Sequence, residues 1–554
     1  MLEGLGDIAW DQLEHNCGTA EEIPHLLRAR RWSTKPDWDL GELLWDSYGP
    51  DSAANAALPF LVDLASSVDT PWRICVLINL SRLARDGVDD PDWLRVWGRE
   101  RLRVLALVED DDPAVRRHAW RTFGDGRGSA SGVLEMIRRC WSDVPSRLDI
   151  VVAAGKFAAD DEIAAWLRGL PTDDPQFRLA VAYALELGVE EFLPGFSGDM
   201  EVWWETASFG IAPGAVIGEM TEVFADRPAE HTALLRELSA VPHRRRAVVH
   251  NAGTLLGRWR SPAAELLPIA ASWLEDPDPH VRYEAVYLLG CARSAEHADA
   301  IAALLDDDAL MYDKKISDAA AWALARCGRQ VPGLVRRLRP YPRSNPIRRY
   351  LTLVPSLGQT LDWLVAEALP DVTELVALLD TEHRYSALSA LGEIGTPVPE
   401  LTPADPLAAW AWWKCGGDPV EAADVIATDV TEDGVLRRRA VELLRHIGPA
   451  AAHLADRLPM SDERLPMRVQ TRYAYLRMTG DPGDLVAVCT EALDGVGTGR
   501  FEHVMIAAAE ALGEAGVRLE AAAPALASDR RLCCHAGWRA FDQDEEMRSA
   551  LRNL

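Results

Sequence analysis

The stretch DPHVRYEAVYLLG, Asp278–Gly290, decides the fold. Its aspartate can cap a helix, and its proline suits the first helical turn. Apolar residues follow at three- and four-residue spacing, which is the period of an amphipathic helix. The closing glycine can adopt the left-handed conformation that ends a helix. The stretch therefore predicts one complete helix with a defined start and end.

Related stretches recur along the chain, among them DPAVRRHAW (Asp112–Trp120) and DPQFRLAVAYAL (Asp174–Leu185). A second helical pattern precedes each copy, as in AAELLPIAASWLED (Ala263–Asp276). The closing glycine, or the residue aligned with it, recurs at intervals of 33, 35, 30, 37, 21, 32, 31 and 37 residues. These markers are Arg260, Arg293, Gly328, Gly358, Gly395, Gly416, Gly448, Thr479 and Gly516. Two helical patterns in a period in the thirties predict an α-solenoid.

The pattern D-P-x-V-R-x-x-A-x-x-x-L-G resembles the signature of HEAT and HEAT-like repeats, from about Asp110 to Gly516. The N-terminal stretches Asp7–Arg31 and Ala56–Ala65 are similar to the start of uncharacterised HEAT-repeat proteins of actinobacteria. The resemblance implies a curved stack of antiparallel helix pairs that binds other macromolecules, and it assigns no chemistry.

We predict an all-α fold, a single right-handed superhelix of about a dozen helix pairs, in which the second helix of each pair lines the concave face. Residues 1–108 are expected to form an N-terminal helical cap with degenerate repeats, 109–516 the solenoid, and 517–554 the C-terminal capping helices. The repeat is interrupted near 195–216 and 339–349, where we expect a hinge or an elaborated loop.

The charge of the chain predicts the kind of partner. Its 554 residues carry a formal net charge of −28, with 86 acidic against 58 basic residues. Such a field repels a phosphate backbone and attracts a basic protein, so nucleic acid is an unfavourable ligand. The first residues lack a basic start and an apolar run, and no window has the length of a membrane span. We therefore expect a cytoplasmic protein that does not associate with membranes.

Patterns that carry chemistry are missing from the sequence. The nine cysteines form no C-x-x-C pair, no histidine is followed by glutamate, and the glycine-rich loops lack the Gly-Lys-Ser/Thr of a P-loop. Cys533, Cys534 and His535 are adjacent, but neighbours in a helix point in different directions. The sequence thus predicts no metal, no cofactor and no catalytic residue. The motif arginines Arg116 and Arg282 are expected to reach acidic turns in adjacent units.

Alignment of the second helices sorts their positions into columns. Trp412 shares a column with leucines and is predicted to lie in the core. Trp410 shares its column with Trp322, Tyr473 and Glu510, and the column of Trp413 contains Arg445. Because these columns accept charged residues, we expect Trp410 and Trp413 to face water or the groove. Two interpretations remain open for this pair: packing against arginine stems of adjacent repeats, or a role as anchors in a binding surface.

The binding interpretation has two candidate sites. The first is an aromatic and basic patch on the inner face, formed by Trp322, Trp410, Trp413, Lys414, Tyr473 and Arg477. The second is the pair Trp203 and Trp204, for which core and surface positions are both open. Tryptophan, tyrosine and arginine are the residues most enriched at binding hot spots.

The function predicted from these features is a non-catalytic protein-interaction module that binds a basic partner in a concave groove. A concrete version is an immunity or antitoxin-type protein that occludes a basic effector. The alternatives are a HEAT-type enzyme or accessory factor acting on a protein or nucleic-acid substrate, and a scaffold with several partners. The oligomeric state is left open.

Overall fold

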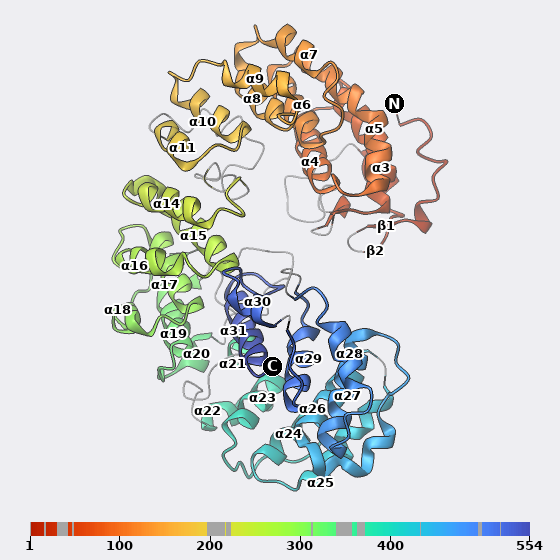
Figure 1. Cartoon of the computed structure of the whole chain (residues 1–554), viewed down its shortest axis with the longest axis vertical. Helices are drawn as coiled ribbons and strands as arrows, with labels where there is room; N and C mark the ends of the chain where they lie inside the picture. Colours follow the sequence, from red (N-terminus) through yellow and green to blue (C-terminus); the bar gives the residue numbers. More distant parts are fainter. Residues whose placement is uncertain are drawn as a thin grey trace. The chain divides into compact units, whose positions relative to one another are not determined.

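The fold was analysed in a computed structural model, which describes residues 2–15, 18–29, 43–46, 49–196, 217, 223–311, 314–338, 357–362, 372–432, 434–496, 501–520 and 522–554. Helices make up nearly all of its regular structure (Figure 1). The strands are two residues long and form antiparallel hairpins: β1 (Glu14–His15) with β2 (Gly18–Thr19), β3 (Trp45–Asp46) with β4 (Gly49–Pro50), and β5 (Leu310–Met311) with β6 (Lys314–Lys315). The prediction of an all-α solenoid is confirmed.

The chain divides into two compact units, Met1–Glu237 and Leu238–Leu554. The division follows the predicted interruption at 195–216, most of which lies outside the described residues. The interruption at 339–349 also lies outside them. The predicted boundaries at 108 and 516 stay a prediction, as does the handedness of the superhelix. The helices that the structure describes include none with both the length and the apolar content needed to cross a membrane.

The first unit is a stack of helix pairs, in which the second helix of one pair packs on the second helix of the next pair. Pairs such as α4 and α6, α6 and α8, and α8 and α10 are therefore neighbours. Its helices include α1 (Ile23–Ala29), α3 (Ser52–Ser66), α4 (Arg73–Asp86), α5 (Pro91–Ala106), α6 (Pro113–Asp125), α7 (Val133–Cys140), α8 (Arg147–Gly155), α9 (Asp161–Arg168), α10 (Pro175–Ala184) and α11 (Val189–Gly195). Helix α14 (Pro228–Ser239) crosses the boundary between the units.

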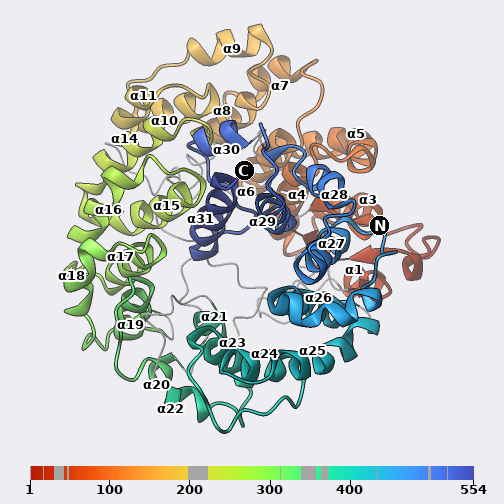
Figure 2. The ribbon, with the colours of Figure 1, turned by 60° about the horizontal axis from the view of Figure 1, so that its bottom comes forward.

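The second unit contains a run of inner helices that pack on one another, with further helices outside them (Figure 2). The inner helices are α15 (Arg245–Arg258), α17 (Pro279–Cys291), α19 (Ile316–Arg326), α21 (Leu357–Asp362), α23 (Arg384–Ile394), α24 (Pro406–Lys414), α26 (Val435–Ile447), α27 (Leu465–Thr479), α29 (Val504–Glu514) and α31 (Trp538–Arg552). The outer ones are α16 (Ala263–Ser272), α18 (Ala298–Ala302), α20 (Leu334–Leu338), α22 (Val372–Val376), α25 (Pro419–Ile426), α28 (Leu485–Ala492) and α30 (Ala522–Ala527).

The predicted helix starts are confirmed by their capping contacts. Asp112, Asp174 and Asp278 each accept a hydrogen bond from a backbone N–H two residues later, at 2.9, 2.7 and 2.9 Å. The predicted end of α17 is wrong in one detail. Gly290 stays helical, and the left-handed conformation falls on Arg293, with φ 50°. Gly290 is needed for a different reason, because a β-carbon there would lie 2.6 Å from the Trp322 ring.

The motif arginines form a repeated contact that we call the ladder. Arg116 of α6 donates to Asp143 at 2.8 and 3.0 Å, and Arg282 of α17 donates to Asp307 at 2.9 Å. Both aspartates lie in acidic turns of the following unit, so the structural role predicted for these arginines is confirmed. Further steps of the ladder are Arg73–Asp110, Arg245–Asp276, Arg384–Asp405 and Arg437–Asp462.

The second unit closes on itself through its last helix. Helix α31 packs on α29, its predecessor among the inner helices, and also on α15 and α17 at the start of the unit. Just before it, Arg530 forms a β-bridge with Trp259, and the Arg531 N–H donates to the Arg258 carbonyl at 2.8 Å. We call this set of contacts the closure. It joins residues separated by more than two hundred positions in the chain.

Buried ion pairs hold the closure together. Arg326 of α19 donates to both oxygens of Asp542 at 2.6 and 2.7 Å, and the two side chains are only 2% and 3% exposed. Asp544 is fully buried and accepts hydrogen bonds from Arg260, Arg531 and Arg548, at 2.6, 2.9 and 2.8 Å. Although burial alone raises the pKa of Asp544, hydrogen bonds from Leu532 and Arg548 hold it below the ordinary value.

Candidate functional site

Three of the four aromatic members of the predicted patch are buried. Trp322, Trp410 and Tyr473 are 1%, 6% and 5% exposed, so the expectation that their column faces water or the groove is wrong. The physical reason is lateral packing between inner helices. Trp322 stacks on Tyr287 of the neighbouring helix, with ring centroids 5.2 Å apart. Trp410 occupies the space above Gly392, where a β-carbon would lie 2.2 Å from its ring.

Trp412 of α24 is more exposed than predicted, whereas Trp410 is more buried than predicted. Trp412 was expected in the core, yet it is only half-buried and lies over Gly417. Trp413 is also half-buried, and Lys414 is exposed. The Lys414 ammonium nitrogen lies 6.0 Å from the ring centroids of both Trp410 and Trp413. This short cluster therefore combines a cation with one buried ring, Trp410, and one half-buried ring, Trp413.

Tyr473 belongs to a second cluster, on α26, α27 and α29. The Arg445 guanidinium carbon lies 4.7 Å from the centre of its ring, and its hydroxyl donates to Glu514 at 2.9 Å. Arg477 donates to the same carboxylate at 3.0 Å. For Trp410 and Trp413 the sequence left open packing against arginine stems. The structure shows such packing at Tyr473, whereas the cation beside Trp410 and Trp413 is Lys414.

The basic residues of the patch, Lys414 and Arg477, act on a common neighbour, His446 of α26. Burial and, in the same direction, the charges of Arg445, Lys414 and Arg477 lower the pKa of His446 to about 4. His446 is therefore neutral at pH 7. We call the residues Lys414, Arg445, Arg477, Glu510, Glu514 and Glu546 the charged row, because they succeed one another on α24, α26, α27, α29 and α31.

The acidic end of the charged row is crowded. Glu510, Glu514 and Glu546 are all exposed, on two helices that pack on each other. Desolvation on this face, together with Asp542 and Glu510, raises the pKa of Glu546 to about 7. The pKa of Glu510 is raised as well, mainly by desolvation. Sequence reasoning placed Glu510 in the same column as Trp410 but missed Glu546, which lies beyond the last repeat.

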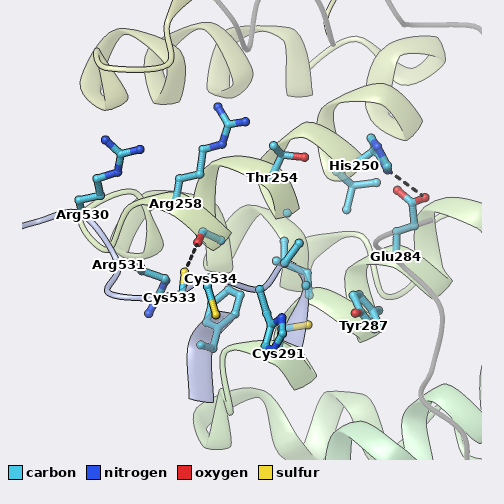
Figure 3. Close-up of a pocket in the computed structure, with 18 residues that line it drawn as sticks. His250, Thr254, Arg258, Glu284, Tyr287, Cys291, Arg530, Arg531, Cys533 and Cys534 are labelled. Atoms are coloured by element: carbon cyan, nitrogen blue, oxygen red, sulfur yellow. Dashed lines mark hydrogen bonds and ion pairs between the residues drawn. The ribbon is translucent and has the colours of Figure 1, made fainter. Parts of the chain in front are cut away.

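The remaining candidates do not join this surface. Trp203 and Trp204 lie outside the described residues. Cys533, Cys534 and His535 line a cavity at the closure (Figure 3). Burial raises the pKa of Cys533 to about 11, so its thiol is neutral at pH 7. Within the part of the chain that the structure describes, no three His, Cys, Asp or Glu side chains are grouped to hold a metal ion.

No protein-family model matches the sequence, and no curated protein matches it. Solved structures match at low identity. Kap95p, which induces the switch loops of RanGDP to adopt the GTP-bound conformation, is 12% identical over 96% of this chain and 66% of its own, with a TM-score of 0.27. Kap121p bound to RanGTP is 13% identical over 89% and 56%, with a TM-score of 0.26. The UNC-45 chaperone, described as binding and folding muscle myosin, is 13% identical over 90% and 51%, with a TM-score of 0.19.

The chain spans between about half and two thirds of the length of these proteins. TM-scores of this size carry no argument about the partner of this chain. The helix pairs, caps and ladder described above establish the solenoid by themselves. The narrower similarity to actinobacterial proteins stays a prediction.

Proposed function

We propose that this chain is a non-catalytic protein-binding solenoid whose partner is basic, and that the partner docks on the acidic end of the charged row. The observation that carries this proposal is the crowding of exposed carboxylates at Glu510 and Glu546. Glu510 and Asp542 raise the cost of ionising Glu546. Glu514 raises that of Glu510, although Arg445 already lies 3.8 Å from the Glu510 carboxylate. A further cation supplied by a partner would relieve the remaining repulsion. Glu514 adds a third carboxylate, although it already bonds Tyr473 and Arg477.

The overall charge supports the same partner. A formal net charge of −28 attracts a basic protein over a distance of about a Debye length, roughly 8 Å at physiological salt. Charge of this kind chiefly raises the association rate and discriminates against acidic partners. The tightness of the complex then depends on contacts made after encounter. The half-buried ring of Trp413 beside Lys414 is a candidate for such a contact.

The specific form of this proposal is an immunity or antitoxin-type role, in which the chain covers a basic effector and blocks its active surface. The acidic end of the charged row supports a basic effector rather than an acidic one. Occlusion requires one partner in a fixed stoichiometry, whereas a scaffold binds several partners. Native mass spectrometry of the captured complex separates the two roles.

The experiment is affinity capture of the full chain from its native host at low salt, followed by mass spectrometry. We expect a basic protein that is lost when Glu510, Glu514 and Glu546 are changed together to Gln. The matched control changes Glu275, Glu421 and Glu432 to Gln, since these are exposed glutamates outside the charged row. The control alters the net charge by the same amount. Equal loss in both triple variants would contradict docking on the charged row, and capture of an acidic protein or nucleic acid would contradict the basic partner.

A further inference from the structure

A cavity of about 280 Å³ lies where the segment before α31 crosses α15 and α17 (Figure 3). Small-molecule sites begin at about 300 Å³, so the cavity has the size of a compact ligand. Val249, Leu288 and Phe541 give it apolar walls. Burial raises the pKa of the lining thiol Cys291 to about 12, so this group is also uncharged at pH 7.

Two glycines of α15 keep the floor of the cavity open. Gly253, Thr254 and Gly257 follow at helical spacing and therefore lie on one face. A glycine inside a helix costs about 1 kcal/mol relative to alanine. At Gly290 that cost has a packing reason, because a β-carbon would lie 2.6 Å from Trp322. A β-carbon at Gly253 or Gly257 would meet no atom of the described residues within 4 Å. Packing therefore does not require these two glycines.

A buried carboxylate lines one end of the cavity. The Glu284 side chain is only 8% exposed, and its Oε1 lies 3.8 Å from His250 Nδ1. Its other oxygen, Oε2, is buried and accepts no hydrogen bond from the residues that the structure describes. A buried acceptor without a donor costs about 1–3 kcal/mol, and more when it is charged. A ligand ammonium group that drew the Glu284 carboxylate toward the cavity would remove this cost.

A cation lies at the other end. Figure 3 shows Arg258 and Arg530 on one side of the cavity and the His250–Glu284 pair on the opposite side. Within the described ranges of the chain, no hydrogen-bond or ion-pair partner is found for the Arg258 guanidinium. Arg258 follows His250 by eight residues on the same helix, which is about 12 Å along the axis. The cavity thus offers an anion site and a donor site at its two ends.

We propose that this cavity binds a small zwitterion, with its acidic group at Arg258, its ammonium group at the Glu284 carboxylate, and an apolar chain between them over Gly253 and Gly257. An ω-amino acid has this arrangement of groups, whereas an ordinary α-amino acid places its charges too close together to reach both ends. The proposal is separate from protein recognition by the charged row, since it uses none of the same residues.

The test is isothermal titration calorimetry of the full chain with 6-aminohexanoate and with hexanoate, which lacks the ammonium group. We expect saturable binding of one 6-aminohexanoate per chain, and binding of hexanoate that is at least about tenfold weaker. Glu284→Gln should abolish this difference and leave hexanoate binding unchanged, which shows that the variant is folded. Glu275→Gln, at an exposed position on the same unit, should keep the difference.

Filling the floor provides a second test. Gly257→Ala should weaken binding of 6-aminohexanoate while raising thermal stability, because alanine favours the helix. Gly98→Ala in α5 is the matched control, since a β-carbon there also meets no described atom within 4 Å. It should raise stability without changing binding. The proposal is overturned if 6-aminohexanoate shows no saturable binding at about 10 mM, or if Glu284→Gln leaves its affinity unchanged.

Discussion

The second unit uses the same pair of residue types, arginine and aspartate, in two different settings. On the ladder, Arg282 and Asp307 are 16% and 19% exposed and lie 25 residues apart in the chain. At the closure, Arg326 and Asp542 are almost fully buried and lie 216 residues apart. Water still solvates the ladder pair when one partner is removed, but it does not reach the closure pair. The contribution of an ion pair therefore depends on its burial more than on its geometry.

The largest difference between the two settings should appear at Asp544. Asp544→Asn removes the charge that Arg260, Arg531 and Arg548 share. It leaves the buried Arg531 and Arg548 without an anion, while Arg260 keeps its ion pair with Glu545 at 2.9 Å. We expect a loss of about 3–5 kcal/mol in the free energy of unfolding of the second unit. Urea unfolding followed by circular dichroism measures it. A loss below about 1 kcal/mol would show that the closure is as solvated as the ladder.

A paired substitution separates burial from charge at the closure. Asp542→Asn alone should destabilise the second unit by about 3 kcal/mol, because Arg326 stays buried without a counterion. The double variant Arg326→Met, Asp542→Leu should recover most of this loss, since buried ion pairs are often no better than apolar pairs of similar size. The same urea titration gives both values. Failure of the double variant to recover would mean that the pair also fixes the position of α31.

A smaller effect is expected on the ladder. Arg282→Ala removes the contact with Asp307 and the hydrogen bond to the Asp276 carbonyl at 2.6 Å. We expect a loss of about 1 kcal/mol, because the groups left behind remain partly solvated. Arg116→Ala in the first unit should behave alike, since its contacts are equivalent. Thermal unfolding of both variants measures the effect. A loss equal to that of Asp542→Asn would remove the distinction between the two settings.

The smallest expected effect depends on pH and concerns Glu546, at the edge of the closure. Its pKa is raised to about 7, so its favourable contribution is fully present below the unfolded pKa of about 4.3 and is lost as the pH rises through 7. Glu546→Gln should therefore raise the stability at pH 8 and not at pH 4. Because the side chain is exposed, the gain should stay below about 1 kcal/mol. Melting temperatures of the variant and the unchanged protein at the two pH values test this. A gain in stability at pH 4 alone would contradict the expected pH dependence.

The ladder could be predicted from the sequence and the closure could not. Capping aspartates and motif arginines recur with every repeat, so Arg116 and Arg282 could be assigned a role from periodicity alone. Asp542 and Asp544 lie after the last repeat, and nothing in their local sequence points to Arg326 or Arg260. Long-range pairing of this kind leaves no periodic signal.

The column analysis failed at Trp322, Trp410 and Tyr473 for a related reason. A glutamate in the same column, Glu510, is exposed and lies 3.8 Å from the Arg445 guanidinium of α26. An aromatic ring at the equivalent backbone position lies flat against the neighbouring helix and is covered by it. The column therefore fixes the direction of the side chain but not its exposure. The glycines opposite the rings, such as Gly392, were the signal that could have revealed this packing.

The closure also has a mechanical consequence. An open stack of helix pairs is elastic, because small rotations at each interface add up to a large change in pitch and end-to-end distance. In a stack whose last helix is fastened to its first, those rotations must cancel around the circuit. The second unit should therefore resist stretching, and a partner would meet a surface of nearly constant curvature rather than one that adjusts to the partner's size.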